Sequence, residues 1–472
     1  METKNILLIN PMQNYPVEYE AYPSGALILI GTMLHNIGHN VKIVHMVVDK
    51  IVPSKLSDII VSFKPEIVGI TMSTFQTKSV KEITKIIKQN NRNILVVVGG
   101  PHPSALKLKI FEDFPYVDVV VIGEGEYTFL EIVEGKNLNE VKGLCYHNKI
   151  NEPRPLTKNL DHIPLPNLDI IGDINNFVGT APIRCHPTMF IMGSRGCPFS
   201  CTFCNKSIWG NTIRYRKPIA IIEEIKWLHE KYGIKEIFFQ DDTFNLNRQW
   251  AEEIFNLIIN NGLNKDIIYR TPFRANKQLI DENLLKLAKK AGFWLIFYGV
   301  ENGNQEMLNR MKKGLKVEEI KRAFELTHKV GLKTIASFII GLPGENKDTI
   351  KDSITLFKEI KPHSVGFSVA IPFPGTELER EVIEKGHLLS QNYDEYSPDN
   401  CVVRTDNLTK EDIERCSGIV NTIIQKEYIK IKLTERFTET VLESIEYPRS
   451  IPAHIRNAKK GFVSILRDIV HL

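Results

Sequence analysis

The sequence predicts an α/β fold in three parts: a doubly wound parallel-sheet (Rossmann-like) domain, a partial (βα)6 barrel and a mainly helical C-terminal region. Three observations support this prediction. β-branched apolar runs alternate with amphipathic segments over the first third of the chain, six further strand-like runs lie between 188 and 375, and the polar remainder has helical periodicity. The expected limits are 1–145 for the first domain, 146–185 for a linker, 186–378 for the barrel and 379–472 for the helical region.

The composition is that of a soluble globular protein, with 43% hydrophobic and 25% charged residues among 472. A net charge of +4 is small for this length and gives no case for a nucleic-acid partner. No window is long and apolar enough to span a membrane, and the N-terminus lacks the regions of a signal peptide. Seven cysteines, three of them clustered, fit a reducing compartment, so we expect a cytoplasmic protein.

The first domain begins with an apolar run at 4–10 and a helical segment at 24–36. Strands are then predicted at 41–48, 66–73, 93–100 and 117–125, and helices at 54–63, 77–90, 103–113 and 126–134. Continuous β-branched strands of this kind belong to a parallel sheet covered on both faces. Its ligands are expected beyond the carboxyl ends of the strands.

Small residues and hydroxyls stand at those strand ends. Glycine lets a flat ligand approach the backbone and a hydroxyl can hydrogen-bond it, although a tight turn is the simpler explanation for any single glycine. No G-x-G-x-x-G follows the first strand, which argues against a nicotinamide or flavin cofactor. The candidate ligand residues are Thr71, Ser73, Gly99, Gly100, Pro101, His102, Gly123, Glu124 and Gly125.

Four prolines between 153 and 166 interrupt the pattern, and we expect a connector there, preceded by a small hairpin at 143–150. The barrel strands then begin at Thr188, Glu236, Asp266, Trp294, Lys333 and Ser364. Each run except the last leads clearly into a helix, and six units instead of eight predict an incomplete barrel. Aromatic residues that alternate along these strands are predicted to be core.

Charged and polar residues stand at the carboxyl ends of the barrel strands, where barrel active sites lie. Arg274 and Glu301 could contact a ligand there or pair with each other in a salt bridge. Lys312 and Lys313 lie at a helix end, where a solvated face is expected. The candidate ligand residues of the barrel are Asp241, Asp242, Arg274, Glu301, Gly341 and Pro343.

Three cysteines, Cys197, Cys201 and Cys204, follow the first barrel strand in the spacing C-x3-C-x2-C. Thiolates are soft ligands, and a cubane that normally takes four cysteines would keep one iron open if only these three bound it. Zinc with His186 as a fourth ligand, or a disulfide with one cysteine left over, are the alternatives. Cys401 and Cys416 are isolated and are predicted to be buried structural thiols.

This cysteine spacing resembles the signature of the radical S-adenosylmethionine (SAM) enzymes. The segments VGITMS, VVVGGPH and VIGEGE resemble the cobalamin-binding domain of the cobalamin-dependent members. The resemblance implies three cofactors: a [4Fe-4S] cluster on Cys197, Cys201 and Cys204, with Phe203 in the same loop; SAM chelated to the open iron; and cobalamin. The residues 10–25 hold no histidine, so cobalamin would bind without a histidine ligand, and turn or surface roles are expected for His39 and His102.

The same resemblance assigns places in the barrel. The pair Asp241 and Asp242 stands where the family's motif meets the SAM amino group, GVENGN resembles the motif near the ribose, and FIIGLPGE resembles the one beside the adenine. The implied activity is radical methylation of an unactivated carbon through a 5′-deoxyadenosyl radical and methylcobalamin. The alternatives are an oxidative cyclase without methyl transfer and, from another class, a catalytically silent cobalamin or SAM sensor.

The partners implied are a small-molecule, lipid or natural-product substrate and an electron donor such as flavodoxin or ferredoxin. The C-terminal region could form a lid over the barrel or pack on its outer wall. No second cysteine cluster is present in the sequence, which argues against a member with auxiliary clusters.

Overall fold

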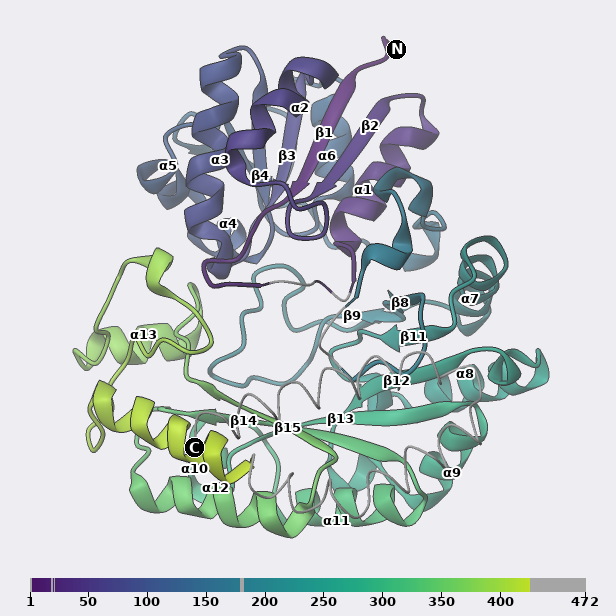
Figure 1. Cartoon of the computed structure of the whole chain (residues 1–472), viewed down its shortest axis with the longest axis vertical. Coiled ribbons are helices and arrows are strands. Elements are labelled where there is room, and N and C mark those ends of the chain that lie inside the picture. Colours follow the sequence, from purple (N-terminus) through teal and green to yellow (C-terminus); the bar gives the residue numbers. More distant parts are fainter. Residues whose placement is uncertain (1, 18–19, 21, 179–181, 425–472) are drawn as a thin grey trace, which may run out of the picture.

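The computed structural model describes residues 2–17, 20, 22–178 and 182–424. It consists of two α/β bodies that face each other (Figure 1). The first domain, coloured purple to blue, lies above the barrel domain, coloured teal to green. The expected architecture of a doubly wound sheet followed by a partial barrel is confirmed.

The first sheet has the strand order β2-β1-β3-β4-β5-β6-β7. Its first five strands are parallel, and the last two are added antiparallel at one edge. The strands are β1 (Asn5–Asn10), β2 (Asn40–His45), β3 (Ile67–Thr71), β4 (Leu95–Gly99), β5 (Val119–Val121), β6 (Leu144–Tyr146) and β7 (Lys149–Ile150).

Helices cover both faces of this sheet. Side chains alternate along β1, so that Ile6 and Leu8 pack into the core under one helix layer, and Leu7 and Ile9 into the core under the other. The first layer contains α1 (Gly25–Asn36) and α6 (Glu126–Val133); the second contains α2 (Leu56–Phe63) and α3 (Thr77–Asn90). This two-sided burial is why the strands read as continuous apolar runs.

Two details differ from the sequence-based expectation. The hairpin at 144–150 pairs with β5, so the sheet continues beyond the limit expected at residue 145. The helix expected at 103–113 is broken into α4 (Pro101–Leu106) and α5 (Ile110–Asp113), because Lys107 between them has a left-handed backbone with φ of 55°.

The barrel sheet has six parallel strands in the order β15-β14-β13-β12-β11-β8, and the sheet does not close on itself. Its strands are β8 (Thr188–Ile191), β11 (Glu236–Phe239), β12 (Ile268–Phe273), β13 (Phe293–Glu301), β14 (Lys333–Ile340) and β15 (Ser364–Val369). All six were expected from the sequence. Phe239 and Tyr298 are buried, as predicted for core aromatics, whereas Phe238 and Phe297 are half-buried.

Helices lie along the outer face of this sheet (Figure 1). Neighbouring helices of the layer pack on one another in chain order, which buries the apolar stripe of each against the strands. The layer consists of α7 (Pro218–Tyr232), α8 (Arg248–Asn260), α9 (Glu282–Lys290), α11 (Val317–Lys329) and α12 (Lys347–Ile360), and the short helix α10 (Gln305–Arg310) follows β13.

The region after the barrel contacts both domains. It begins with α13 (Glu377–Glu384), and a helical run occupies 410–424. Between them, Asp394 forms an ion pair of 3.0 Å with Lys81 of α3, and the Tyr393 carbonyl accepts a hydrogen bond of 3.0 Å from Asn14. This segment therefore joins the two domains, a role that neither alternative foresaw; the helical residues expected at 434–472 lie outside the described residues.

Within the described part of the chain, the helices are all too short or too polar to cross a membrane.

Candidate active site between the two domains

The three clustered cysteines lie in a loop closed by a short antiparallel ribbon. Strand β9 (Ser194–Arg195) enters the loop and β10 (Arg214–Tyr215) leaves it. The base of the loop is rigid, because Gly193 lies so close to the Trp250 ring that any Cβ there would stand 2.8 Å from it. The cysteine loop, defined as 196–213, is therefore presented at the carboxyl end of β8.

The Cys197 and Cys201 thiols lie close enough to Cys204 to influence it. Burial raises the pKa of Cys204 to about 11, and the neighbouring Cys201 and Cys197 raise it further. All seven cysteines are free. Among the described residues, no three histidine, cysteine or acidic side chains are placed to hold a metal ion. Three cysteines in one loop suit a multi-iron cluster, in which each thiolate binds a different iron.

The two neighbouring aspartates at the end of β11 have different positions. Asp241 is buried beneath the cysteine loop, where it accepts hydrogen bonds from the Ser194 hydroxyl and from the Gly193 amide at 3.2 Å. Burial raises the pKa of Asp241 to about 7, and those hydrogen bonds partly oppose the shift. Asp242 is exposed and lines a cavity. Asp241 thus supports the loop, and only Asp242 faces the space where a ligand could bind.

That cavity, of about 280 Å³, lies at the carboxyl ends of the barrel strands. Two carboxylates and two cations meet in it, a set of groups that complements a ligand with both an ammonium and a carboxylate. Its lining includes Asp242, Thr243, Arg274, Phe297, Glu301 and Lys313. The structure thus brings together Asp242, Arg274 and Glu301 from three different strands.

Glu301 is held in an unusual conformation. Its φ of 67° is left-handed, and the pairing between β13 and β14 shifts register at this point. A non-glycine residue in this region costs free energy and persists only where its surroundings hold it. The Lys313 ammonium lies 2.7 Å from the Glu301 carboxylate, and both side chains are 9% exposed.

This pair corrects two expectations. Glu301 pairs with Lys313 and not with Arg274, and Lys313 is buried instead of lying on a solvated helix end. Lys312 is exposed, as expected, and pairs with Glu377 at 2.5 Å. In the turn after α10, Lys312 has φ of 54°, which changes the direction of the backbone between the two adjacent lysines. One side chain is therefore exposed and the other is buried.

Arg274 connects β12 to the cysteine loop. Its guanidinium lies 3.5 Å from the centre of the Phe199 ring, and its Nε donates to Asn276 at 2.6 Å. Its Nη2 is buried without a hydrogen-bond partner among the described residues. A buried unpaired donor beside the cavity is a group that an anionic ligand could satisfy. Phe203 of the same loop is half-buried, with the Lys313 ammonium 5.9 Å from its ring centre.

Gly341 and Pro343 at the end of β14 are buried by protein. A Cβ on Gly341 would lie 3.2 Å from Ile413 of the helical run 410–424. Below them, Glu345 accepts hydrogen bonds from the Gly341 amide and from Asn302 at 2.8 Å. This network ties the GLPGE segment to the GVENGN segment, and it lies beneath the cavity lining and not within it.

The strand ends of the first domain face the cysteine loop. The Ser207 hydroxyl donates to the Pro101 carbonyl at 3.1 Å, and the Ile208 carbonyl lies 3.8 Å from the place of a Cβ on Gly123. Thr71, Ser73 and Gly99 are half-buried at the same edge, as is Gly125. The cysteine loop and the strand ends of the first domain therefore meet at one interface.

Gly100 has a structural explanation. Its φ is 113°, and a Cβ would lie 2.7 Å from the Met72 carbonyl oxygen. Only glycine lets the end of β4 approach β3 so closely. A tight turn therefore explains the glycine at this position.

Both histidines are buried, which corrects the surface role expected for them. His102 is 0% exposed, with Nδ1 at 3.0 Å from the Thr74 hydroxyl and its ring 4.8 Å from Tyr393. Burial lowers the pKa of His102 to about 3, so the ring is neutral. His39 is 5% exposed, and its Nδ1 accepts a hydrogen bond of 3.2 Å from the Lys4 amide.

Glu124 also has protein partners. Its carboxylate accepts from Arg195 at 2.8 Å and from Arg214 at 3.0 Å, both of the ribbon that closes the cysteine loop. Because both oxygens are engaged, these contacts indicate a role in joining the domains in place of the cofactor contact expected from the sequence.

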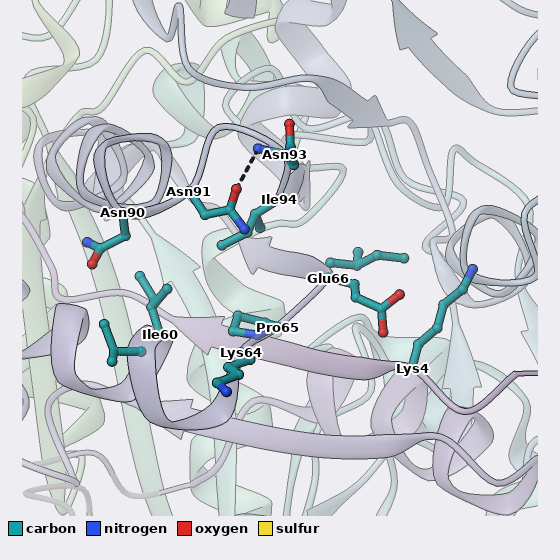
Figure 2. Close-up of a pocket in the computed structure, with 11 residues that line it drawn as sticks. Lys4, Ile60, Lys64, Pro65, Glu66, Asn90, Asn91, Asn93 and Ile94 are labelled. Carbon is teal, nitrogen blue, oxygen red and sulfur yellow. Dashed lines mark hydrogen bonds between the residues drawn. The ribbon is translucent and has the colours of Figure 1, made fainter.

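A larger hollow, of about 600 Å³, lies at the opposite edge of the first sheet (Figure 2). It is lined by turns at the amino ends of the strands, including exposed side chains of Lys64, Glu66, Asn90 and Asn91. Asn91 accepts a hydrogen bond of 2.9 Å from the Asn93 amide within the rim. Ligands of parallel sheets bind at the carboxyl edge, so this hollow is not part of the candidate site.

Sequence reasoning missed the roles of four residues that hold the site together: Lys313, Glu345, Arg195 and Arg214. Their partners lie between 4 and 90 residues away in the chain, and no local pattern marks them. Arg195 alone carries a signal, because only Gly196 separates it from Cys197.

Family models match both parts of the chain. Residues 191–357 match the radical SAM superfamily, and residues 15–133 match the B12 binding domain. The chain belongs to the cobalamin-dependent radical SAM enzymes. Its relatives include the uncharacterized methyltransferase PH0819 of Pyrococcus horikoshii, which is 33% identical over 92% of this chain and 93% of the relative.

A second relative is the anaerobic magnesium-protoporphyrin IX monomethyl ester cyclase of Cereibacter sphaeroides. It is 27% identical, over 86% of this chain and 66% of the relative. Among solved structures, the cobalamin-dependent SAM radical enzyme OxsB with aqua-cobalamin bound has the same fold, with a TM-score of 0.70 and 18% identity over 98% of this chain and 71% of OxsB.

The cofactors of this class are a [4Fe-4S] cluster, SAM and cobalamin, and the residues present fit them. The Cys204 thiol with Cys197 and Cys201 near it suits the cluster, and a cavity with paired charges suits a zwitterionic sulfonium. The small residues at the strand ends of the first domain allow a planar macrocycle to approach the backbone.

Proposed function

We propose that the protein is a radical methyltransferase that transfers a methyl group from cobalamin to an unactivated carbon of a small-molecule, lipid or natural-product substrate. The observation that supports this best is the direct contact between the cysteine loop and the strand ends of the B12-binding domain, through Ser207 and Pro101 at 3.1 Å. The similarity to a relative named as a methyltransferase, over nearly the full length of both chains, points the same way.

In this proposal the residues have distinct tasks. Cys197, Cys201 and Cys204 hold the cluster as its three protein ligands, and the cluster, SAM and cobalamin when bound supply the radical and methyl chemistry. Asp242 and Glu301 offer carboxylates to the ammonium and ribose of SAM, and Arg274 offers its unpartnered Nη2 to the SAM carboxylate. Phe203 stacks beside them.

The first domain supplies the second surface. Thr71, Ser73, Gly99 and Gly123 form its half-buried edge for cobalamin, and the neutral His102 is covered by Tyr393 and so is not a cobalt ligand. The protein's part is to orient the two cofactors and to exclude water, since radicals at carbon are quenched by solvent-borne donors.

The overall balance requires an external reductant. Each methylation consumes two SAM molecules: one yields methionine and 5′-deoxyadenosine by accepting an electron and a hydrogen atom, and the other yields S-adenosylhomocysteine by giving up its methyl group. A second electron per turnover would be needed for cobalamin, when bound, to accept the next methyl group. A flavodoxin or ferredoxin in the cytoplasm is the donor we propose.

The test uses the full chain, reconstituted with iron, sulfide and cobalamin and supplied with methyl-labelled SAM and a reductant. We expect 5′-deoxyadenosine in the solution and label on the cobalamin. If 5′-deoxyadenosine is absent although the cluster is loaded, the protein is not a radical enzyme, and the sensor alternative stands.

The second candidate is an oxidative cyclase, favoured by the relative that bears this name. In that case 5′-deoxyadenosine forms, but no label reaches cobalamin. The labelling experiment therefore separates the two activities before the substrate is known.

A further inference from the structure

Four charged side chains form a compact group where the first domain meets the cysteine loop. Arg195 lies 2.8 Å from Glu124 and 2.7 Å from Glu126, and Arg214 lies 3.0 Å from Glu124. We call these four residues the interdomain charge cluster. The two glutamates come from the first domain and the two arginines from the barrel domain, so every ion pair crosses the interface.

The position of each member is informative. Glu124 follows Gly123 directly at the carboxyl end of β5, within the edge proposed for cobalamin. Arg195 and Arg214 are paired opposite each other in the ribbon of β9 and β10, which closes the cysteine loop. One carboxylate of the first domain therefore holds both ends of the loop that carries the three cysteines.

The cluster is buried and its charges balance. The four side chains are between 5% and 12% exposed. Burial by itself raises the pKa of Glu124, but hydrogen bonds from Arg214 and Arg195 outweigh it, so the pKa is lowered and the carboxylate is charged. Removing one member of such a group leaves a buried charge without a partner, which lowers the free energy of unfolding.

The connector between the domains is fastened at the same place. The Thr157 amide donates to Glu124 at 2.8 Å, and the Thr157 carbonyl accepts from Arg214 at 2.7 Å. Thus the first domain, the connector and the cysteine loop meet at Glu124.

We propose that the interdomain charge cluster is a positioning device that sets the distance between the cobalamin edge and the cysteine loop. Its loss would leave SAM cleavage largely intact, because the backbone pairing of β9 and β10 still closes the cysteine loop. It would slow methyl passage from SAM to cobalamin, because that reaction crosses the interface. The inference rests on the proposed function, since it assumes that the two cofactors react with each other.

The best single change is Arg214→Gln. Only Nη1 of Arg214 makes hydrogen bonds, while its Nε and Nη2 have no partner among the described residues. A lysine ammonium can take the place of that one nitrogen, so Arg214→Lys is the rescue variant. The control is Arg154→Gln: Arg154 pairs with Glu131 on α6, where the two side chains are 18% and 24% exposed against 9% and 5% for Arg214 and Glu124, and this pair lies within the first domain and its connector.

The experiment compares these variants as reconstituted holoenzymes with cobalamin and cluster both loaded. For Arg214→Gln we expect 5′-deoxyadenosine formation within about twofold of the parent, and label transfer to cobalamin lowered about tenfold or more, the scale for truncating one partner of a buried charge pair. Arg214→Lys should recover most of the transfer, and Arg154→Gln should change neither rate. A parallel fall of both rates in Arg214→Gln would show a merely structural role and overturn the proposal.

A second readout does not depend on methyl transfer. Dipolar EPR spectroscopy between cob(II)alamin and the reduced cluster measures their separation directly. We expect a narrow distance distribution in the parent and in Arg154→Gln, and a broadened one in Arg214→Gln. An unchanged distribution in Arg214→Gln overturns the proposal. If the parent transfers no label but Arg214→Gln still broadens the distribution, only the proposed methyl transfer is refuted.

Discussion

The carboxyl ends of the strands form one edge in each domain, and the two edges face each other across the domain interface. They differ in the types of residue that they carry. The edge of the first domain consists mainly of small neutral residues, with Gly99, Gly100 and Gly123 beside small hydroxyl residues, and its charged Glu124 is engaged by two arginines. The edge of the barrel carries charged side chains, among them Arg274 and Glu301. A wide planar cofactor needs close access to the backbone, whereas a small zwitterion needs fixed charges, so the contrast follows from the ligands proposed for each edge.

The edges also differ in how they are held in place. The first depends on backbone geometry, as at Gly100, where strand ends touch. The barrel edge depends on ion pairs, as between Glu301 and Lys313. Substitutions should therefore damage one edge without the other, and each prediction below tests that separation.

The largest effect is expected from Cys201→Ala. Loss of one of three thiolate ligands should prevent a stable cluster and abolish SAM cleavage, while cobalamin binding at the other edge stays at the parental level. Iron content, 5′-deoxyadenosine and the cobalamin absorbance spectrum measure these outcomes in one preparation. Retained SAM cleavage would refute the cluster assignment, and loss of cobalamin binding would refute the independence of the two edges.

Lys313→Met should weaken SAM binding while leaving cobalamin binding unchanged. The methionine keeps the apolar stem but leaves the Glu301 carboxylate buried without its cation, at a cost of about 2 kcal/mol or about thirtyfold in affinity. Equilibrium dialysis with SAM on the cluster-loaded protein measures the change.

The adjacent Lys312 provides the control for that prediction. Its pair with Glu377 is solvent-exposed, so Lys312→Met should alter SAM affinity by no more than about twofold. Equal losses in the two variants would mean that a general change of charge, and not the buried pair, governs SAM binding.

Gly100→Ala should damage the first edge alone. The new methyl group would meet the Met72 carbonyl, and overpacking of this kind costs about 1 to 3 kcal/mol, so cobalamin affinity should fall about tenfold while SAM cleavage persists. Gly38→Ala is the matched control, because Gly38 has φ of 92° but nothing within 4 Å. If both alanine variants lose cobalamin equally, the left-handed backbone and not the contact with β3 is responsible.

The last prediction concerns pH and the stability of the barrel, not ligand binding. Burial raises the pKa of Glu345 to about 7 from 4.5, so the folded state binds a proton that the unfolded state has already released. Its contribution to the stability of the barrel is therefore present below pH 4.5 and is lost as the pH rises to 7, by up to about 1.4 kcal/mol per pH unit. Thermal unfolding between pH 5 and 8 should show a shallower slope for Glu345→Gln; an equal slope would place the titration elsewhere.

Much of the fold was predictable because its signals are local. Each barrel strand is a run of apolar residues that ends in a polar turn, and all six were found in place. The break in the helix at Lys107 was not predictable, because a lysine in the sequence gives no sign that its backbone is left-handed. The hairpin at 144–150 was expected, but its pairing with β5 depends on an edge that only the folded sheet provides.

In the candidate site, too, some features were predictable from the sequence and others were not. The sequence by itself determined the chemistry, because three cysteines in one loop and polar residues after parallel strands are recognisable without any partner. Only the tertiary structure decided which side chains face the ligand: it buried Asp241 beneath the loop, paired Glu301 with Lys313, and engaged Glu124 with two arginines. Those choices depend on contacts between residues distant in the chain, and the free energy of a buried charge is set by the partner that folding brings to it.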